Sequence, residues 1–210
     1  MTTRATWYFD FISPFAFLQW RHLVALGARL AVEPVPILFA AVLDHHGQKG
    51  PAEIAGKRRF TYQYVMWRAR RDGIALTFPP AHPYNPLPAL RLSLALGNRP
   101  EAISAIFDHL WIDGRAGDSA EALAPVGAKL GVADVAAAIA VPAVKDALKR
   151  NTEGAIAAGV FGVPTLAFGD AQFWGDDATA MALDYAERRL DLDAPEYARI
   201  ATLPATAARR

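Results

Sequence analysis

A strand-like segment that runs directly into Ser13-Pro14 is the feature that most limits how this chain folds. Residues 6–12 are almost all apolar and predict a strand, and residues 14–26 predict the helix that follows it. Serine is favoured as a helix N-cap and proline at the first helical position. A short strand-to-helix connection points backbone N–H groups and one hydroxyl at the space above a sheet, which suits an anionic sulfur or oxygen. The motif therefore predicts a β-to-α unit and a candidate ligand-binding corner.

A second strand is predicted over residues 31–39, although it contains two prolines. Pro34 and Pro36 are two positions apart, so their missing N–H groups fall on the same side of the strand. That side lacks donors for a neighbour, which predicts an edge strand. A right-handed crossover through the helix makes the first two strands parallel.

The middle of the chain is predicted to be helical and the end returns to strands. Segments 165–168 and 171–174 flank Gly169-Asp170, which predicts a tight type II′ hairpin, and a last helix is predicted over 176–190. The proline-rich segment 79–88 predicts a stiff loop. The other predicted helices cover residues 52–72, 87–97, 100–113, 118–130, 134–140 and 142–159.

This order predicts an α/β, thioredoxin-like fold with a large α-helical insertion. Residues 1–40 and 151–210 would form the thioredoxin-like domain, and residues 41–150 the helical insertion domain. A chain of 210 residues is long enough to bury a sizeable core.

Composition excludes several classes of function. The chain has no cysteine, so it has neither a disulfide framework nor a Cys-x-x-Cys redox centre. Its net charge of +1 does not favour a nucleic-acid partner. We expect no signal peptide and no membrane span, because no window of about 20 uncharged apolar residues occurs. The five histidines show no metal-ligand spacing with acidic partners, so we expect no metal site.

Five segments of the chain form motifs that point to a family: Phe9-Asp10-Phe11-Ile12-Ser13-Pro14-Phe15, Lys57-Arg58-Arg59-Phe60, Pro83-Tyr84-Asn85-Pro86-Leu87, Gly162-Val163-Pro164-Thr165 and Phe173-Trp174-Gly175-Asp176-Asp177. Together they resemble the motifs of 2-hydroxychromene-2-carboxylate isomerases and kappa-class glutathione transferases. The resemblance covers nearly the whole chain and is specific in combination. It implies glutathione as cofactor, a small aromatic substrate and a homodimer, and the absence of cysteine fits a cytoplasmic location.

The resemblance implies that Ser13 is the catalytic residue and donates a hydrogen bond to the glutathione sulfur. A serine hydroxyl is too weak an acid to ionise readily, but as a donor at a helix N-terminus it can hold a thiolate. The alternative is a plain N-cap, and the two roles are compatible. The resemblance also implies a cis Val163-Pro164 bond, with the Val163 backbone pairing with the cysteinyl unit of the ligand.

The remaining glutathione contacts are implied in the same way. Asp176 and Asp177 would bind the γ-glutamyl end, and the alternative is a simple complement to the helix dipole. Ala178 departs from the family motif, which has arginine there. Lys57 would meet the glycine carboxylate, unless it is a solvated charge. Gln48 stands where kappa-class members have asparagine, and Lys49 is a weaker candidate.

A substrate pocket of Trp67, Tyr84 and Asn85 is expected between the insertion and the sheet, although the aromatic residues also suit ordinary core. The cluster of Arg68, Arg70 and Arg71 is expected to be a solvated helix face.

The predicted function is a glutathione-dependent cis-trans isomerase of an aromatic carboxylate, acting by reversible thiolate addition. The alternatives are a kappa-class-like glutathione transferase or peroxidase, and a non-catalytic thioredoxin-like binding protein.

Overall fold

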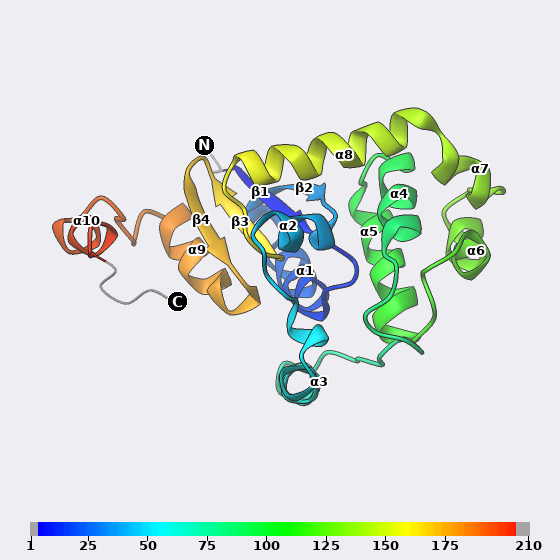
Figure 1. The fold of residues 1–210 in the computed structure, drawn as a ribbon, viewed down its shortest axis with the longest axis horizontal. Coiled ribbons are helices and arrows are strands. Elements are labelled where there is room, and N and C mark those ends of the chain that lie inside the picture. The colour runs from blue at the N-terminus through cyan, green and yellow to red at the C-terminus, as the bar shows by residue number, and fades with distance from the viewer. Residues whose placement is uncertain (1–3, 205–210) are drawn as a thin grey trace.

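The strands form one mixed sheet that joins the two ends of the chain. The computed structural model describes residues 4–204, and its four-stranded sheet has the order β2-β1-β3-β4 (Figure 1). β1 and β2 are parallel, and the other two pairs are antiparallel. The predicted α/β thioredoxin-like class is confirmed. The strands are β1 (Arg4–Phe9), β2 (Ala31–Pro36), β3 (Thr165–Phe168) and β4 (Ala171–Trp174).

β2 lies at one edge of this sheet, as its prolines predict. Pro34 stands opposite Trp7 and Pro36 opposite Phe9 in the parallel register. The strand ends at Pro36 instead of continuing to residue 39, because Phe39 begins a short helix, α2 (Phe39–His45). The prediction of strand for residues 37–39 is therefore wrong.

The hairpin between β3 and β4 has the predicted two-residue turn. Gly169 has a φ of 62°, whereas Asp170 is not at positive φ. This pattern fits a type II′ turn, in which only the first central residue needs the left-handed region.

Most predicted helices form, with shifts at their ends. The last one is divided into a 3-10 turn (Asp176–Ala178) and α9 (Thr179–Ala186), so Arg188 and Arg189 lie beyond its end. A helix that was not predicted, α10 (Pro195–Ala201), lies apart from the sheet in Figure 1. The others are α1 (Pro14–Leu26), α3 (Ala55–Arg71), α4 (Leu87–Ala95), α5 (Pro100–Phe107), α6 (Ala120–Lys129), α7 (Val135–Ala140) and α8 (Pro142–Ala157).

The alternation of β1 gives the sheet two buried faces. Trp7 and Phe9 belong to the larger core with α1, α4 and α5, and their rings stack at 4.3 Å. Tyr8 points to the other face, where it packs on a smaller cluster that includes Val42 of α2 and Ala155 of α8. Burial of each large apolar side chain contributes about 1.5–3 kcal/mol. Helices on both faces therefore hold the end of β1 in place.

Gln19 links the core to the start of α9. Its side chain is fully buried; Oε1 accepts a hydrogen bond from the Trp7 indole at 2.7 Å, and Nε2 donates to the Gly175 carbonyl at 3.0 Å and the Thr179 hydroxyl at 2.9 Å. A buried amide with all of these bonds made resists displacement. It fixes the distance between α1 and the segment after β4.

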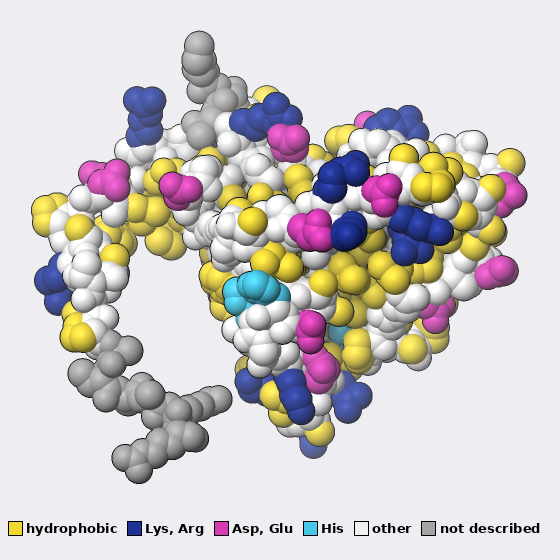
Figure 2. Space-filling view, turned by 45° about the horizontal axis from the view of Figure 1, so that its top comes forward, with side chains coloured by type: hydrophobic (Ala, Val, Ile, Leu, Met, Phe, Trp, Pro, Cys, Tyr) yellow, Lys and Arg dark blue, Asp and Glu magenta, His cyan; other side chains and the backbone are white. Residues whose placement is uncertain are grey.

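Basic side chains gather on one exposed helix. Figure 2 shows Lys and Arg at the lower end of the molecule, where Figure 1 places α3, the helix that carries the exposed Lys57, Arg58, Arg59 and Arg70. Within residues 4–204, no helix has the length and hydropathy needed to cross a membrane.

The sheet contains strands from residues 4–36 and 165–174, which fits the predicted insertion of a helical block into one thioredoxin-like unit. The domain boundaries at residues 40 and 150 stay a prediction, and residues 1–3 and 205–210 of the predicted domain lie outside the described part of the chain.

Candidate active site

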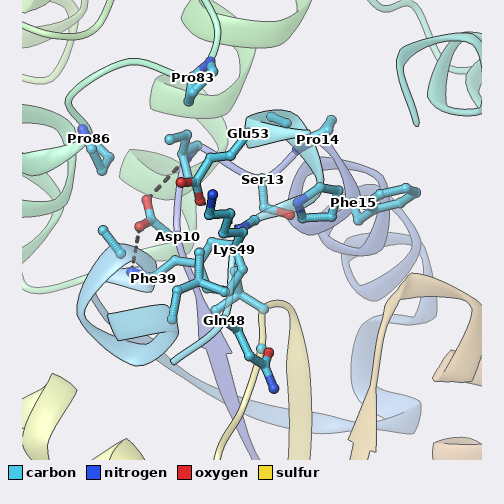
Figure 3. A pocket seen from close by; sticks show the side chains of 18 of the residues that line it. Asp10, Ser13, Pro14, Phe15, Phe39, Gln48, Lys49, Glu53, Pro83 and Pro86 are labelled. Carbon is cyan, nitrogen blue, oxygen red and sulfur yellow. Dashed lines mark hydrogen bonds between the residues drawn. The ribbon is translucent and has the colours of Figure 1, made fainter. Parts of the chain in front are cut away.

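A cavity of about 860 Å³ lies above the end of β1 (Figure 3). The turn 10–15 forms its floor, and α2 with the loop 48–53 forms one wall. The proline-rich segment 82–86 forms another wall, and residues 161–163 with Trp174 close the remaining side. Segments from both ends of the chain and from the helical block thus meet at one site.

Ser13 stands in this cavity as the N-cap of α1. Its Oγ accepts a hydrogen bond from the Ala16 N–H at 3.2 Å, and the residue is 7% exposed. The predicted cap is therefore confirmed. The cap uses the hydroxyl oxygen as an acceptor, and no described residue accepts the hydroxyl proton. The O–H group is left free to donate to a ligand.

Three side chains from the helical block hold the turn that precedes Ser13. The Phe11 carbonyl accepts hydrogen bonds from the Tyr84 hydroxyl and the Trp111 indole, both at 2.9 Å. His82 Nε2 donates to the Ile12 carbonyl at 2.8 Å. These bonds fix the backbone from which Ser13 projects.

His82 has a defined tautomer. Its Nε2 faces a carbonyl and must carry the proton, so Nδ1 is an acceptor in the neutral ring. The Tyr62 hydroxyl lies 2.7 Å from Nδ1 and 2.8 Å from the His82 carbonyl, so its one proton is shared between these two acceptors. Burial lowers the pKa of His82 below its ordinary value, which favours this neutral form. Tyr62 and His82 were not predicted as site residues, and no local pattern in the sequence indicates that they pair.

Val163 lies in the side of the cavity that residues 161–163 form. The Val163-Pro164 bond is cis, as predicted, and neither the N–H nor the C=O of Val163 has a hydrogen-bond partner within residues 4–204. Gly162 packs against the Trp174 indole so closely that a Cβ there would collide with the ring. Trp174 is 55% exposed and lines the cavity beside Val163. The unpaired backbone groups of Val163 and the indole of Trp174 are therefore both available to a ligand in this part of the cavity.

Asp10 is the buried acid of the site. It is fully buried below the cavity, three residues before Ser13. Burial raises the pKa of its carboxyl to about 7, against the opposing effect of backbone N–H groups. It was not predicted as a site residue, although a carboxylate directly after a buried strand is a signal that points to it.

The loop after α2 supplies polar groups to the wall. Gln48 and Lys49 line the cavity, as does Glu53, whose carboxylate accepts a hydrogen bond from the Gly50 N–H at 2.6 Å. The Lys49 ammonium has no ion pair or hydrogen bond among the described residues. It is the only lysine or arginine in the described cavity wall.

The Asp176 carboxylate is not among the described groups that line the cavity, and its predicted contact with the γ-glutamyl end of glutathione stays a prediction. It is buried and bonds Arg68 at 2.6 Å and His22 at 3.1 Å. Arg68, expected to be solvated, is 7% exposed, whereas Arg70 and Arg71 are exposed as predicted. Arg68 of α3 thus supplies a guanidinium beside a motif that has Ala178 in place of arginine.

Other predicted site residues lie outside the cavity wall. Lys57 is exposed on α3, and Asp177 is exposed after the buried Asp176. Trp67 is 52% exposed and stacks on Tyr64, with Arg71 over its ring at 4.9 Å. The Asn85 side chain accepts a hydrogen bond from the Leu87 N–H at 3.1 Å at the start of α4. Of the expected substrate pocket, only Tyr84 lines the cavity.

Comparison with known proteins places the chain in a family. Residues 6–186 match the model of the DSBA-like thioredoxin domain. A 2-hydroxychromene-2-carboxylate isomerase of Pseudomonas putida is 32% identical over 196 residues, which cover 87% of this chain and 93% of the relative. A protein of the same name from Pseudomonas sp. (strain C18) is 30% identical and covers 83% of this chain and 85% of its own.

A solved structure of 2-hydroxychromene-2-carboxylate isomerase superposes with a TM-score of 0.78 at 25% identity, over 89% of this chain and 95% of that one. The chain therefore belongs to the DsbA-like thioredoxin-domain family and is a homologue of the 2-hydroxychromene-2-carboxylate isomerases.

Proposed function

We propose that this protein is a glutathione-dependent cis-trans isomerase of an aromatic carboxylate. The observation that carries the proposal is the Ser13 hydroxyl, whose oxygen caps α1 while its proton has no acceptor among residues 4–204. A free O–H at a helix N-terminus stabilises a thiolate through a charge-assisted hydrogen bond and the helix dipole. The names of the curated relatives support an isomerase.

The proposed reaction needs a nucleophile that leaves as easily as it adds. The glutathione thiolate forms a bond to a conjugated carbon of the substrate, and the π electrons move to the conjugated carbonyl oxygen. The former double bond rotates as a single bond. Elimination then breaks the carbon–sulfur bond and restores the double bond in the other geometry. Glutathione returns unchanged, with Ser13 bonded to its sulfur whenever the thiolate is free.

The cavity wall suits these two ligands. The unpaired backbone groups of Val163 would pair with the cysteinyl unit of glutathione. Gln48 and Lys49 would contact a carboxylate, because an amide and an ammonium both donate hydrogen bonds. Tyr84 would contact the aromatic ring of the substrate. Asp177 is the remaining candidate for the γ-glutamyl ammonium, since the Asp176 carboxylate already has two partners.

Ser13→Ala tests the proposal. We expect turnover to fall about 10- to 100-fold, because a hydrogen bond to a charged group is worth roughly 1.5–3 kcal/mol. The apparent pKa of bound glutathione, followed by thiolate absorbance, should rise. Loss of the cap should also lower the free energy of unfolding by about 1 kcal/mol.

Ser119→Ala is a matched control, because the Ser119 hydroxyl caps α6 in the same way, by accepting from the Ala122 N–H. It should lose similar stability while thiolate absorbance and turnover stay at wild-type level. A Ser13→Ala enzyme that behaves like Ser119→Ala would overturn the proposal. Consumption of glutathione in each turnover would instead indicate a transferase.

The homodimer and the cytoplasmic location stay predictions. Sedimentation of the purified chain measures the first directly.

A further inference from the structure

Asp10 is the buried ionisable group beneath the cavity for which the proposed reaction has no use. Its residue is fully buried, and no lysine, arginine or histidine among residues 4–204 makes an ion pair with it. Burial of a carboxylate without a partner of opposite charge costs free energy. Such a group at the floor of a ligand cavity therefore needs a structural explanation. The contacts of its two oxygens supply that explanation.

One carboxylate oxygen shapes the turn that carries Ser13. Asp10 Oδ1 accepts a hydrogen bond from the Ile12 N–H at 3.1 Å, which makes an Asx turn. The Asp10 backbone carbonyl also accepts from the Ser13 N–H at 3.1 Å. Asp10 therefore defines the backbone on the floor of the cavity.

The other oxygen reaches the wall that α2 forms. Asp10 Oδ2 accepts a hydrogen bond from the Phe39 N–H at 2.9 Å, across 29 positions in the sequence. Phe39 is the first residue of α2, and the residue at the N-cap position of that helix is Leu38, which makes no side-chain cap bond. Asp10 thus caps α2 from outside the helix.

These two bonds join the floor of the cavity to the wall that α2 forms. Figure 3 shows the Asp10 carboxylate between the turn below Ser13 and the start of α2. α2 leads directly into the loop that places Gln48 and Lys49 in the wall. We propose that Asp10 is a positioning residue: its ionised carboxylate clamps α2 to the Ser13 turn and so sets the position of the α2 wall relative to the floor that carries Ser13.

The charge on the clamp should change near neutral pH. Each N–H bond is stronger to a carboxylate than to a neutral carboxyl group. Burial raises the pKa of Asp10 to about 7, whereas burial lowers the pKa of His82 and raises that of Tyr84 well above its ordinary value. The other charged groups in the cavity wall are Asp44 on α2 and Lys49 and Glu53 on the following loop.

The clamp is tested on the full chain without ligand. Carboxyl carbon NMR of aspartate-labelled protein should show Asp10 titrating with a midpoint near pH 7. The amide protons of Ile12 and Phe39 should move downfield with the same midpoint, because both bonds strengthen when the acceptor ionises. Asp10→Asn should flatten both amide titrations. Asp44→Asn, the same change at an exposed residue in the same wall, should leave them unchanged.

Two outcomes of this experiment overturn the clamp. In one, the chemical shifts of the Ile12 and Phe39 amide protons do not change with the midpoint at which the Asp10 carboxyl titrates. The other is an Asp10→Asn protein, folded by circular dichroism, that keeps the wild-type amide titrations.

The effect on ligand binding rests on the proposed glutathione site and is measured separately. S-methylglutathione has no titrating thiol, so its dissociation constant reports on the walls. Calorimetry should show tighter binding to the wild type at about pH 8 than at about pH 6, and binding to Asp10→Asn about ten-fold weaker at the higher pH. Tighter binding at the lower pH would contradict the clamp, since the ligand would then sense charge repulsion. If S-methylglutathione binds at neither pH while the amide titrations are as expected, the proposed glutathione site is wrong. The proposal that Asp10 joins α2 to the Ser13 turn would still hold.

Discussion

Asp10 and Asp176 are both buried aspartates that lie shortly after a strand, β1 and β4 respectively, and they differ in what balances the charge. The Asp176 carboxylate has the Arg68 guanidinium at 2.6 Å and the His22 ring at 3.1 Å. The Asp10 carboxylate has only backbone N–H groups, and the pKa of its carboxyl rises to about 7. A buried guanidinium balances the charge of the Asp176 carboxylate, whereas no charged group among the described residues balances that of Asp10, so the charge of Asp10 depends on solution pH.

Removal of the Arg68 guanidinium should produce the largest change in the free energy of unfolding. Arg68→Met leaves Asp176 buried with only the half-buried His22 as partner, and we expect a loss of about 3–5 kcal/mol in the free energy of unfolding. Urea titration at constant pH measures it. Arg70→Met, on the exposed side of the same helix, should change stability by no more than about 0.5 kcal/mol. Equal losses in the two variants would show that Asp176 does not depend on Arg68.

The second effect concerns Asp10 and appears as a dependence on pH. Its carboxyl has a pKa of about 7 in the folded protein and about 3.9 in an unfolded chain, so the folded state holds the extra proton between these values. Stability should therefore fall as pH rises from about 4 to about 7, by up to about 4 kcal/mol, and then level off.

Asp10→Asn should remove this slope, and Asp44→Asn should keep it. Urea midpoints measured across this window give the comparison. A wild-type protein whose slope matches that of Asp10→Asn would mean that the Asp10 carboxyl keeps its ordinary pKa in the fold.

The third effect is smaller and comes from the histidine beside Asp176. A hydrogen bond to Asp176 is the main cause that raises the pKa of His22 above its ordinary value, against the effect of burial. The stabilisation is complete below about pH 6.5 and is lost as pH rises through the folded pKa. We expect less than about 1 kcal/mol, because the His22 side chain is 33% exposed.

His22→Gln should remove that loss, and His45→Gln, which changes an exposed imidazole, should not. Urea midpoints at about pH 6 and about pH 8 measure it. If His22→Gln and the wild type lose the same stability between those pH values, the loss comes from a group other than His22.

Local sequence predicted the elements whose causes lie within a few residues. Ser13-Pro14 supplies the cap and first residue of α1, Gly169 supplies the positive φ of the hairpin, and the prolines of β2 exclude a partner on one side. α2 was missed, because the groups that bond its first N–H groups are Asp10, 29 positions away, and Thr152, 114 positions away. No window of the sequence contains those bonds.

The same distinction applies to the candidate site. Ser13, Val163, Gln48 and Tyr84 were predicted and line one cavity. His82 was missed because its partners, Tyr62 and Ile12, come from two other elements. Residues placed in the site by motif alone, such as Lys57 and Asn85, lie elsewhere, because a motif gives a residue's type and order but not the direction of its side chain.

By itself the sequence determined the order of the strands, the edge strand, the capped start of α1 and the absence of a thiol of its own, since each depends on neighbouring residues or on composition. Tertiary structure alone decided which charges are buried and what balances them. Arg68 and Asp176 are 108 positions apart, and both Asp10 and Asp176 follow apolar strands in the sequence. Only folding brings a guanidinium to Asp176 and none to Asp10, because burial and ion pairing depend on how distant segments pack.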